Sequence, residues 1–161
     1  MGQGAREAGG GGRQRGTGPG LGRLGWRGGV AQGREARGGS VGMALQGRPA
    51  EDIRAAITER FDYDLTESVD SIRTWYSFDE SCAGTVPQAI ICALDATDFE
   101  DAIRNAISIG GDSDTIAAIT GGIAEGMFGV PEAIEAKARS YLSEELDKVV
   151  SRFAERVGGT Q

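Results

Sequence analysis

From residue 49 onward, apolar residues recur at intervals of three and four positions, and no stretch alternates apolar and polar residues with a period of two. The clearest run begins at Phe99 and continues with alanine and isoleucine at i+3, i+4, i+7 and i+8. This spacing places apolar side chains on one face of a helix. We therefore predict an all-α domain. Its helices are expected to begin near Pro49, Asp64, Thr85, Thr97, Ser113, Pro131 and Ser143.

Two of these starts have the spacing of a capping box, in which a small polar residue and an acid three positions later satisfy each other's backbone N–H groups. The first pair is Asp64 with Glu67, and the second is Thr97 with Glu100. We expect Asp64 and Thr97 to be the N-caps of their helices. Ser143 has the residue type of an N-cap for the last helix, which carries apolar positions up to Val157.

The segment from Ser113 to Met127 is apolar or small on almost every side. A helix of this kind belongs in the centre of a domain, because each of its faces needs an apolar neighbour. The other helices predicted around it barely suffice to surround it. We therefore expect that part of the domain is missing from this sequence.

The first 48 residues differ in composition from the rest. They hold 18 of the 27 glycines and eight of the fifteen arginines, with two glutamates as their only acids. Glycine-rich chain loses much entropy on ordering and offers little surface to bury. We predict a disordered Gly/Arg-rich segment over residues 1–47 and a helical domain over residues 48–158. The composition also matches GC-rich DNA read outside its true frame, with Met43 as an alternative start.

Charge separates the same two parts. Residues 1–48 carry a formal charge of +6 and residues 49–161 carry −13. Arg27-Gly28-Gly29 and Arg37-Gly38-Gly39 resemble RGG segments of RNA-binding proteins, which leaves an RNA-binding arm as an alternative function. Only Trp26 is available there for stacking on bases, and the acidic domain would repel nucleic acid. We expect no nucleic-acid partner.

Several kinds of chemistry are excluded by residue types. The chain has no histidine, so histidine-ligated zinc and Ser-His-Asp or Cys-His catalysis are absent. Cys82 and Cys92 are too few for a disulfide framework, and Cys92 lies in an apolar helix as a core residue would. We expect a reducing, cytoplasmic location. No apolar run is long enough to span a bilayer, so we expect no membrane partner.

The candidate chemistry lies at residues 109–115, Ile-Gly-Gly-Asp-Ser-Asp-Thr. The two glycines allow a sharp turn, after which Asp112, Asp114 and Thr115 can point their oxygens at one spot. Oxygen ligands favour Mg²⁺, Mn²⁺ or Ca²⁺ over zinc, although the pattern does not continue as an EF-hand. Helix capping by Asp112 or Ser113 is the competing interpretation, and it is the commoner use of these residue types.

Residues 109–125, read as a whole, resemble the C-terminal signature of the ADP-ribosylglycohydrolase family. The resemblance extends back through residues 98–106 and 81–87 and covers residues 43–157. It implies the C-terminal portion of an orthogonal all-α fold with a two-metal site for Mg²⁺ or Mn²⁺. Asp112, Asp114 and Thr115 match the family's C-terminal metal ligands, and Gly110 and Gly111 would let the backbone approach the substrate.

The resemblance also implies a reaction and its partners. Family members hydrolyse the glycosidic bond between ADP-ribose and a protein side chain or small acceptor. Their first half carries a Thr-Asp-Asp ligand cluster and the catalytic acids, and no such triplet occurs in this chain. The catalytic residues therefore remain unassigned. We predict a chain that is inactive or that needs a partner to supply missing helices. The alternative is a non-catalytic, crystallin-like member or pseudoenzyme.

Overall fold

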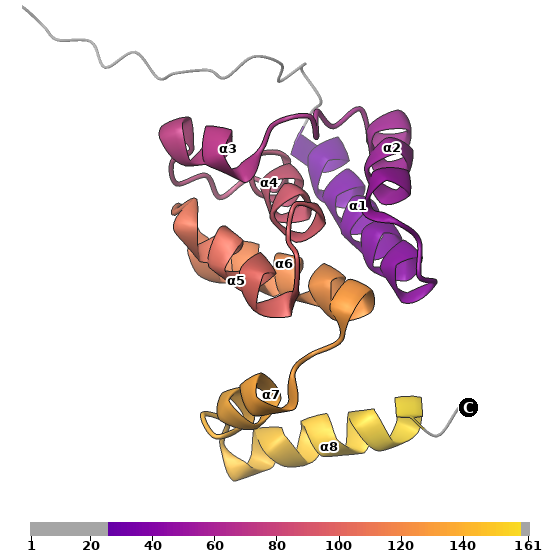
Figure 1. The fold of residues 1–161 in the computed structure, drawn as a ribbon, viewed down its shortest axis with the longest axis vertical. Coiled ribbons are helices and arrows are strands. Elements are labelled where there is room, and N and C mark those ends of the chain that lie inside the picture. Colours follow the sequence, from indigo (N-terminus) through magenta and orange to yellow (C-terminus); the bar gives the residue numbers. More distant parts are fainter. Residues whose placement is uncertain (1–25, 159–161) are drawn as a thin grey trace, which may run out of the picture.

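The computed structural model describes residues 26–158, and within them it contains eight helices and no strand (Figure 1). This confirms the predicted all-α class. The helices are α1 (Trp26–Leu45), α2 (Ala50–Phe61), α3 (Val69–Trp75), α4 (Cys82–Leu94), α5 (Phe99–Ser108), α6 (Ser113–Phe128), α7 (Glu132–Arg139) and α8 (Glu144–Gly158).

Short polar side chains set the starts of three helices by accepting a hydrogen bond from the backbone N–H three residues later. These caps are Ser68 for α3, Ser81 for α4 and Asp98 for α5. The predicted cap at Thr97 is therefore one residue early, and helix α4 begins before Thr85. Ser143 accepts from the N–H of Leu146 at 3.3 Å, as expected for the last helix.

The predicted capping box at Asp64 is wrong. The Asp64 carboxylate instead accepts hydrogen bonds from the N–H and the hydroxyl of Thr66, two residues later, at 3.0 and 2.6 Å. This local turn competes with a helix for the same backbone N–H groups. Helix α3 therefore starts only at Val69, after the cap at Ser68.

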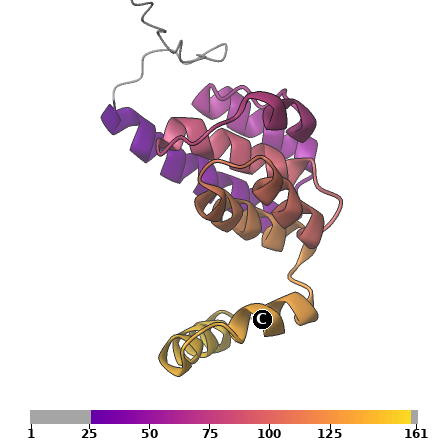
Figure 2. The same cartoon turned by 90° about the vertical axis from the view of Figure 1, so that its left-hand side faces the viewer.

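Helix α4 lies at the centre of the body, where it contacts α1, α2, α3, α5 and α6 and buries most of its residues (Figures 1 and 2). Helix α6 contacts α1, α4 and α5. Ile116 and Ile123 are fully buried, and the buried Thr120 hydroxyl donates to the carbonyl of Ala89 in α4 at 2.9 Å. The segment 113–127 was predicted to be buried on all sides, but α6 is buried on one side only, and Ala118, Glu125 and Phe128 on its other side are exposed. Helices α2 and α3 pack against α4, so the core also includes these two helices.

Helix α1 contradicts the predicted disorder of residues 26–45. Its small residues Ala36, Ser40 and Ala44 recur every four positions and are fully buried. Small side chains let two helix backbones approach closely, so the helix gains packing without large apolar residues. The domain thus begins well before residue 48, and α1 provides α6 with one of the neighbours it needs. Residues 1–25 lie outside the described part.

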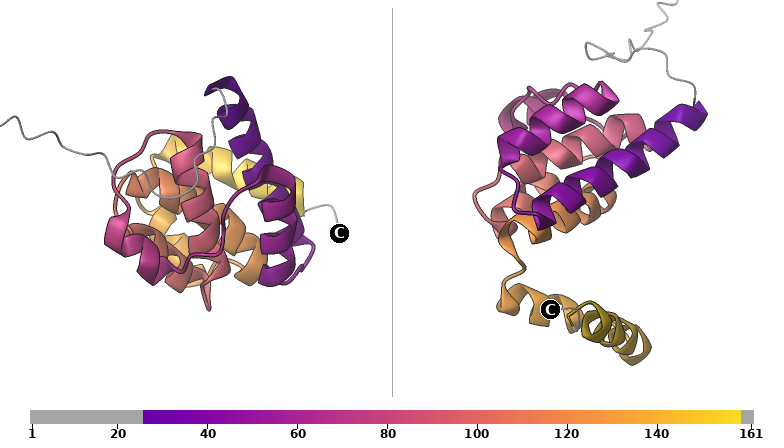
Figure 3. Two further views of the ribbon diagram at one scale, coloured as in Figure 1. Left: turned by 90° about the horizontal axis from the view of Figure 1, so that it is seen from above. Right: turned by 90° about the vertical axis from the view of Figure 1, so that its right-hand side faces the viewer.

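Two close approaches show why α1 is rich in glycine and alanine. A Cβ on Gly33 would lie 2.9 Å from Cys82 Cβ in α4, and a Cβ on Gly126 in α6 would lie 2.8 Å from Ala44 Cβ. These close contacts with α4 and α6 hold α1 along one side of the body (Figure 3).

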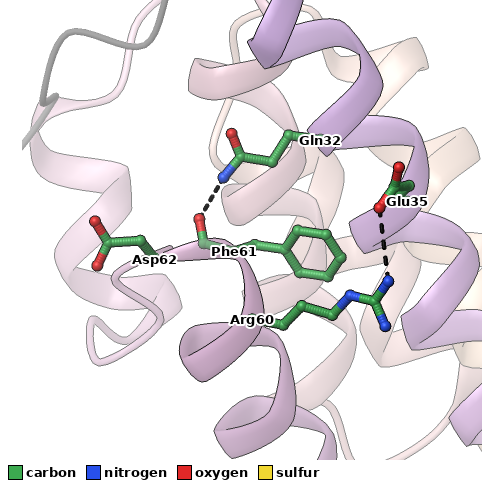
Figure 4. Close-up of a pocket in the computed structure, with 5 residues that line it drawn as sticks. All are labelled: Gln32, Glu35, Arg60, Phe61 and Asp62. Carbon is green, nitrogen blue, oxygen red and sulfur yellow. Dashed lines mark hydrogen bonds and ion pairs between the residues drawn. The ribbon is translucent and has the colours of Figure 1, made fainter.

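Polar contacts fasten α1 to the end of α2 around a shallow hollow (Figure 4). The Gln32 side-chain amide donates to the carbonyl of Phe61. The Arg60 guanidinium lies 3.7 Å from the Glu35 carboxylate. Asp62 ends α2 in the left-handed conformation, with φ of 55°. None of the predicted site residues lines this hollow.

Helices α7 and α8 form a hairpin that lies apart from the body (Figures 1 and 2). The hairpin joins the body where Val130 and Ile134 pack against a small cluster of Phe99, Ala102 and Ala124. No residue of α7 is buried. None of the helices in residues 26–158 is long and apolar enough to cross a membrane.

Candidate metal centre

The turn between α5 and α6 depends on two consecutive glycines in the left-handed conformation. Gly110 has φ of 76° and Gly111 has φ of 68°. Side chains rarely adopt this conformation, so the predicted sharp turn is confirmed. The two positions differ in their surroundings. A Cβ on Gly110 would meet nothing within 4 Å, whereas a Cβ on Gly111 would lie 2.6 Å from Tyr76 Cε1.

Asp112 and Asp114 lie on either side of the first residue of α6. Asp112 stands at the N-cap position, but its side chain makes no capping hydrogen bond. The hydrogen bond with the Asp112 carboxyl and, after it, the one from the backbone N–H of Thr115 hold the pKa of Asp114 below its usual range. The Thr115 N–H contact measures 2.9 Å. The two carboxyl groups therefore lie side by side, and the capping interpretation does not explain Asp112.

Accessibility fits a binding role for this turn. Asp114 and Thr115 are exposed and Asp112 is half-buried, while Ile116 directly behind them is fully buried. The oxygens thus lie at the surface on a rigid base. Two adjacent carboxylates at one helix N-terminus repel each other unless a proton or a cation lies between them.

The segment that precedes α4 borders this turn. Burial raises the pKa of the Tyr76 hydroxyl, and the negative charges of Asp79 and Asp112 contribute to the same shift. The Asp79 carboxylate accepts from the N–H of Ser81 at 2.7 Å, and the Asp79 carbonyl accepts from the Thr85 hydroxyl at 2.9 Å. The starts of α4 and α6 are therefore neighbours, linked through Tyr76.

Tyr76 and Asp79 were not predicted as neighbours of the site. More than 30 residues separate them from Gly111, and no local spacing shows the pairing. The signal that could have suggested it is the second glycine of the turn. One glycine suffices to reverse the chain, so a second one indicates that something approaches the backbone closely.

A divalent cation at this turn would need more ligands than Asp112, Asp114 and Thr115 can provide. Mg²⁺ demands octahedral coordination by oxygen. Asp112, Asp114 and Thr115 offer the right donor atoms from a single turn, but in the part of the chain that the structure describes no group of three or more acidic, histidine or cysteine residues could hold a metal. The described residues thus provide two carboxyl groups and one hydroxyl at this turn, which are fewer donors than such a cation needs.

Cys92 does not add a nucleophile to the site. Its side chain is fully buried in α4, and this burial raises the pKa of the thiol to about 12. A thiol with such a pKa is protonated at neutral pH and is inert. The prediction that Cys92 belongs to the core is confirmed.

Together, these observations describe an all-α protein in which a turn of two glycines precedes two adjacent carboxyl groups at the N-terminal end of α6. The family model of ADP-ribosylglycohydrolase matches residues 30–161, and the chain belongs to this family. No curated protein and no solved structure was found to match it. The match begins within α1, which agrees with the packing of that helix and extends the resemblance from residue 43 back to residue 30.

The two glycines allow a matched prediction about the turn. Gly110→Ala should cost about 1–2 kcal/mol of folding stability, the strain of a left-handed alanine. Gly111→Ala should cost about 1–3 kcal/mol more, because its methyl group also collides with the Tyr76 ring. Urea unfolding followed by circular dichroism compares the two. Equal midpoints for both variants would show that the contact with Tyr76 does not restrict this turn.

Proposed function

We propose that Asp112, Asp114 and Thr115 are ligands on one side of a bound Mg²⁺ or Mn²⁺ ion. The observation that carries this proposal is the pair of carboxyl groups that lie side by side at the surface, at the N-terminal end of α6. Asp112 is not used for capping, and a divalent cation would relieve the repulsion between the two acids. The N-terminal end of α6 itself favours negative charge, so both acids are tolerated there without the metal.

The reaction proposed is that of the family, hydrolysis of the glycosidic bond between ADP-ribose and a protein side chain or small acceptor. A bound divalent cation would supply the positive charge that orients ribose hydroxyls and polarises water. In this chain, Gly110 leaves open space where a side chain would stand, so the backbone is accessible to a substrate. Gly111 faces Tyr76 instead, and its contribution is to position Asp112.

Activity requires ligands that the described residues do not provide. The sequence contains no Thr-Asp-Asp triplet, and no third acidic residue joins Asp112 and Asp114 in residues 26–158. We propose that the remaining ligands come from further helices supplied by a partner, and that the protein works in the cytoplasm. Without that partner the chain binds metal weakly and does not catalyse hydrolysis.

Manganese binding tests the site without requiring activity. The electron paramagnetic resonance signal of free Mn²⁺ falls as the ion binds, so a titration gives the affinity. We expect a single weak site, and Asp112→Asn or Asp114→Asn should weaken it by about tenfold or more, because affinity follows the number of charged ligands. Asp52→Asn is the matched control, since Asp52 also lies in the first turn of a helix.

The control distinguishes a built site from general attraction to an acidic domain. If Asp52→Asn weakens binding as much as Asp114→Asn does, Mn²⁺ responds only to the negative charge of the surface and the proposed site is wrong. If neither site variant changes the affinity, the two carboxyl groups do not hold the ion.

A further inference from the structure

The last helix carries an apolar stripe that nothing in the described residues covers. Five apolar side chains of α8 are exposed, with Phe153 at 67% and Leu146 at 56% of their full accessibility. The stripe consists of Leu146, Val149, Val150, Phe153 and Val157. Leu142, in the turn before the helix, continues it. A contiguous exposed stripe of this kind marks an interaction surface.

Helix α7 packs on a different side of α8. The Arg139 guanidinium of α7 donates to the Asp147 carboxylate at 2.9 Å and to the Ser151 hydroxyl at 2.5 Å. On a helix with about 100° per residue, Asp147 and Ser151 lie about 130° from the centre of the stripe. The hairpin is thus closed by polar contacts, and its own partner helix leaves the stripe open.

A helix of this length needs a packing partner for its apolar face, because most helical stability in proteins comes from tertiary contacts. The segment that precedes α1 is a poor candidate, since residues 1–25 are mostly glycine, arginine and other small or polar residues. The occupant has to be apolar and has to match the charges that border the stripe.

The spacing of the stripe is that of a short coiled-coil seam. Within α8, Leu146, Val149 and Phe153 are separated by intervals of three and four residues, as the two core positions of a heptad are. Glu145 and Arg152 lie seven residues apart on one border of the seam. The other border carries Val150 and Val157, which widen the apolar face.

In a pair of α8 helices, the charges that border the seam attract each other in one orientation only. In a parallel pair, Glu145 would face Val150 of the other helix, and Arg152 would face Val157. In an antiparallel pair, Glu145 of each helix faces Arg152 of the other, which forms two ion pairs per dimer. The same register sets Leu146 of each helix opposite Val149 of the other.

We propose that α8 is a dimerisation helix, which pairs antiparallel with α8 of a second copy of this chain. The interface is isologous, so each residue contact occurs twice. Two helices of this length bury less than the area of a standard stable interface, so we expect a weak dimer that dissociates on dilution. The proposal is independent of the metal site and holds whether or not Asp112 and Asp114 bind a cation.

Sedimentation equilibrium of the full chain at increasing concentration tests the proposal. We expect a monomer–dimer equilibrium. Glu145→Arg places arginine opposite arginine twice and should raise the dissociation constant by about tenfold or more, and Arg152→Glu should do the same. The double variant E145R/R152E restores opposite charges and should return the constant to within about threefold of the original.

Two further variants separate pairing from misfolding. Lys148→Glu changes a charge on the outer side of α8 and should leave the dissociation constant unchanged. Leu146→Asp should abolish the dimer while the thermal melting of the body stays the same, because α8 does not stabilise the body. A chain that stays monomeric at several hundred micromolar overturns the proposal, as does a double variant that fails to restore the dimer.

Discussion

A chain of these 161 residues should release no detectable ADP-ribose from ADP-ribosylated peptides in the presence of Mg²⁺ or Mn²⁺. We propose that the turn before α6 supplies only part of a two-metal ligand set. The metals in such a site act together on the attacking and leaving groups, so an incomplete set should lose almost all of the rate rather than a proportionate share. We expect the rate to lie at least about a thousandfold below that of a complete member of the family assayed in parallel. The assay uses two substrates, a peptide that carries ADP-ribose on arginine and a peptide that carries it on serine.

The control for this prediction is Asp114→Ala in the same chain. The variant should leave the background rate unchanged, because there is no catalysis to remove. Robust metal-dependent release of ADP-ribose that disappears in Asp114→Ala would show that the described turn is part of a complete active site. It would contradict our account of the ligand set.

Removal of α1 should abolish cooperative folding. A chain that begins at Gln46 lacks the helix that packs against α2, α4 and α6, and the apolar surface of all three would face water. Total stabilities of domains are about 5–15 kcal/mol, so loss of one of the three helices packed around α6 exceeds what a small domain tolerates. A chain that begins at Trp26 should melt like the full chain. Circular dichroism and calorimetry measure both.

Point variants examine the same packing without shortening the chain. A Cβ on Gly126 would lie 3.0 Å from the backbone nitrogen of Leu45, whereas a Cβ on Gly122 would meet only Val41 at 3.9 Å. Gly126→Ala should therefore destabilise the fold by about 1–3 kcal/mol. Gly122→Ala should be neutral or stabilise by up to about 1 kcal/mol, because alanine favours helix. A stable chain that begins at Gln46 together with a harmless Gly126→Ala would refute the assignment of α1 to the core.

The helices that could be predicted from the sequence are those with large apolar residues at helical spacing. Helix α5 follows the run from Phe99, and α6 follows the apolar segment from Ser113, although one of its sides is exposed. Helix α1 could not be predicted in this way. Its buried positions are glycine, alanine and serine, which give no signal in a hydrophobicity pattern, and its glycines are those that composition assigns to disorder.

Only some residues of the candidate site could be predicted from the sequence. The glycines and acids of residues 110–114 are contiguous, so their chemistry could be predicted from local spacing. The neighbours from the loop before α4 could not, because Tyr76 and Asp79 reach the site only through the packing of α4 against α6. Helix starts were misplaced by a residue or more where an adjacent polar residue, such as Asp98, competes for the cap.

Paramagnetic mapping with Mn²⁺ tests the central claim most directly. Bound Mn²⁺ broadens the amide signals of nearby residues in a nitrogen–proton correlation spectrum, and so locates the ion without any requirement for activity. At substoichiometric Mn²⁺ we predict that the signals of residues 110–116 broaden first, and that Asp114→Asn removes the effect. Broadening centred on the acidic residues of α7 and α8, with residues 110–116 unaffected, would contradict the account.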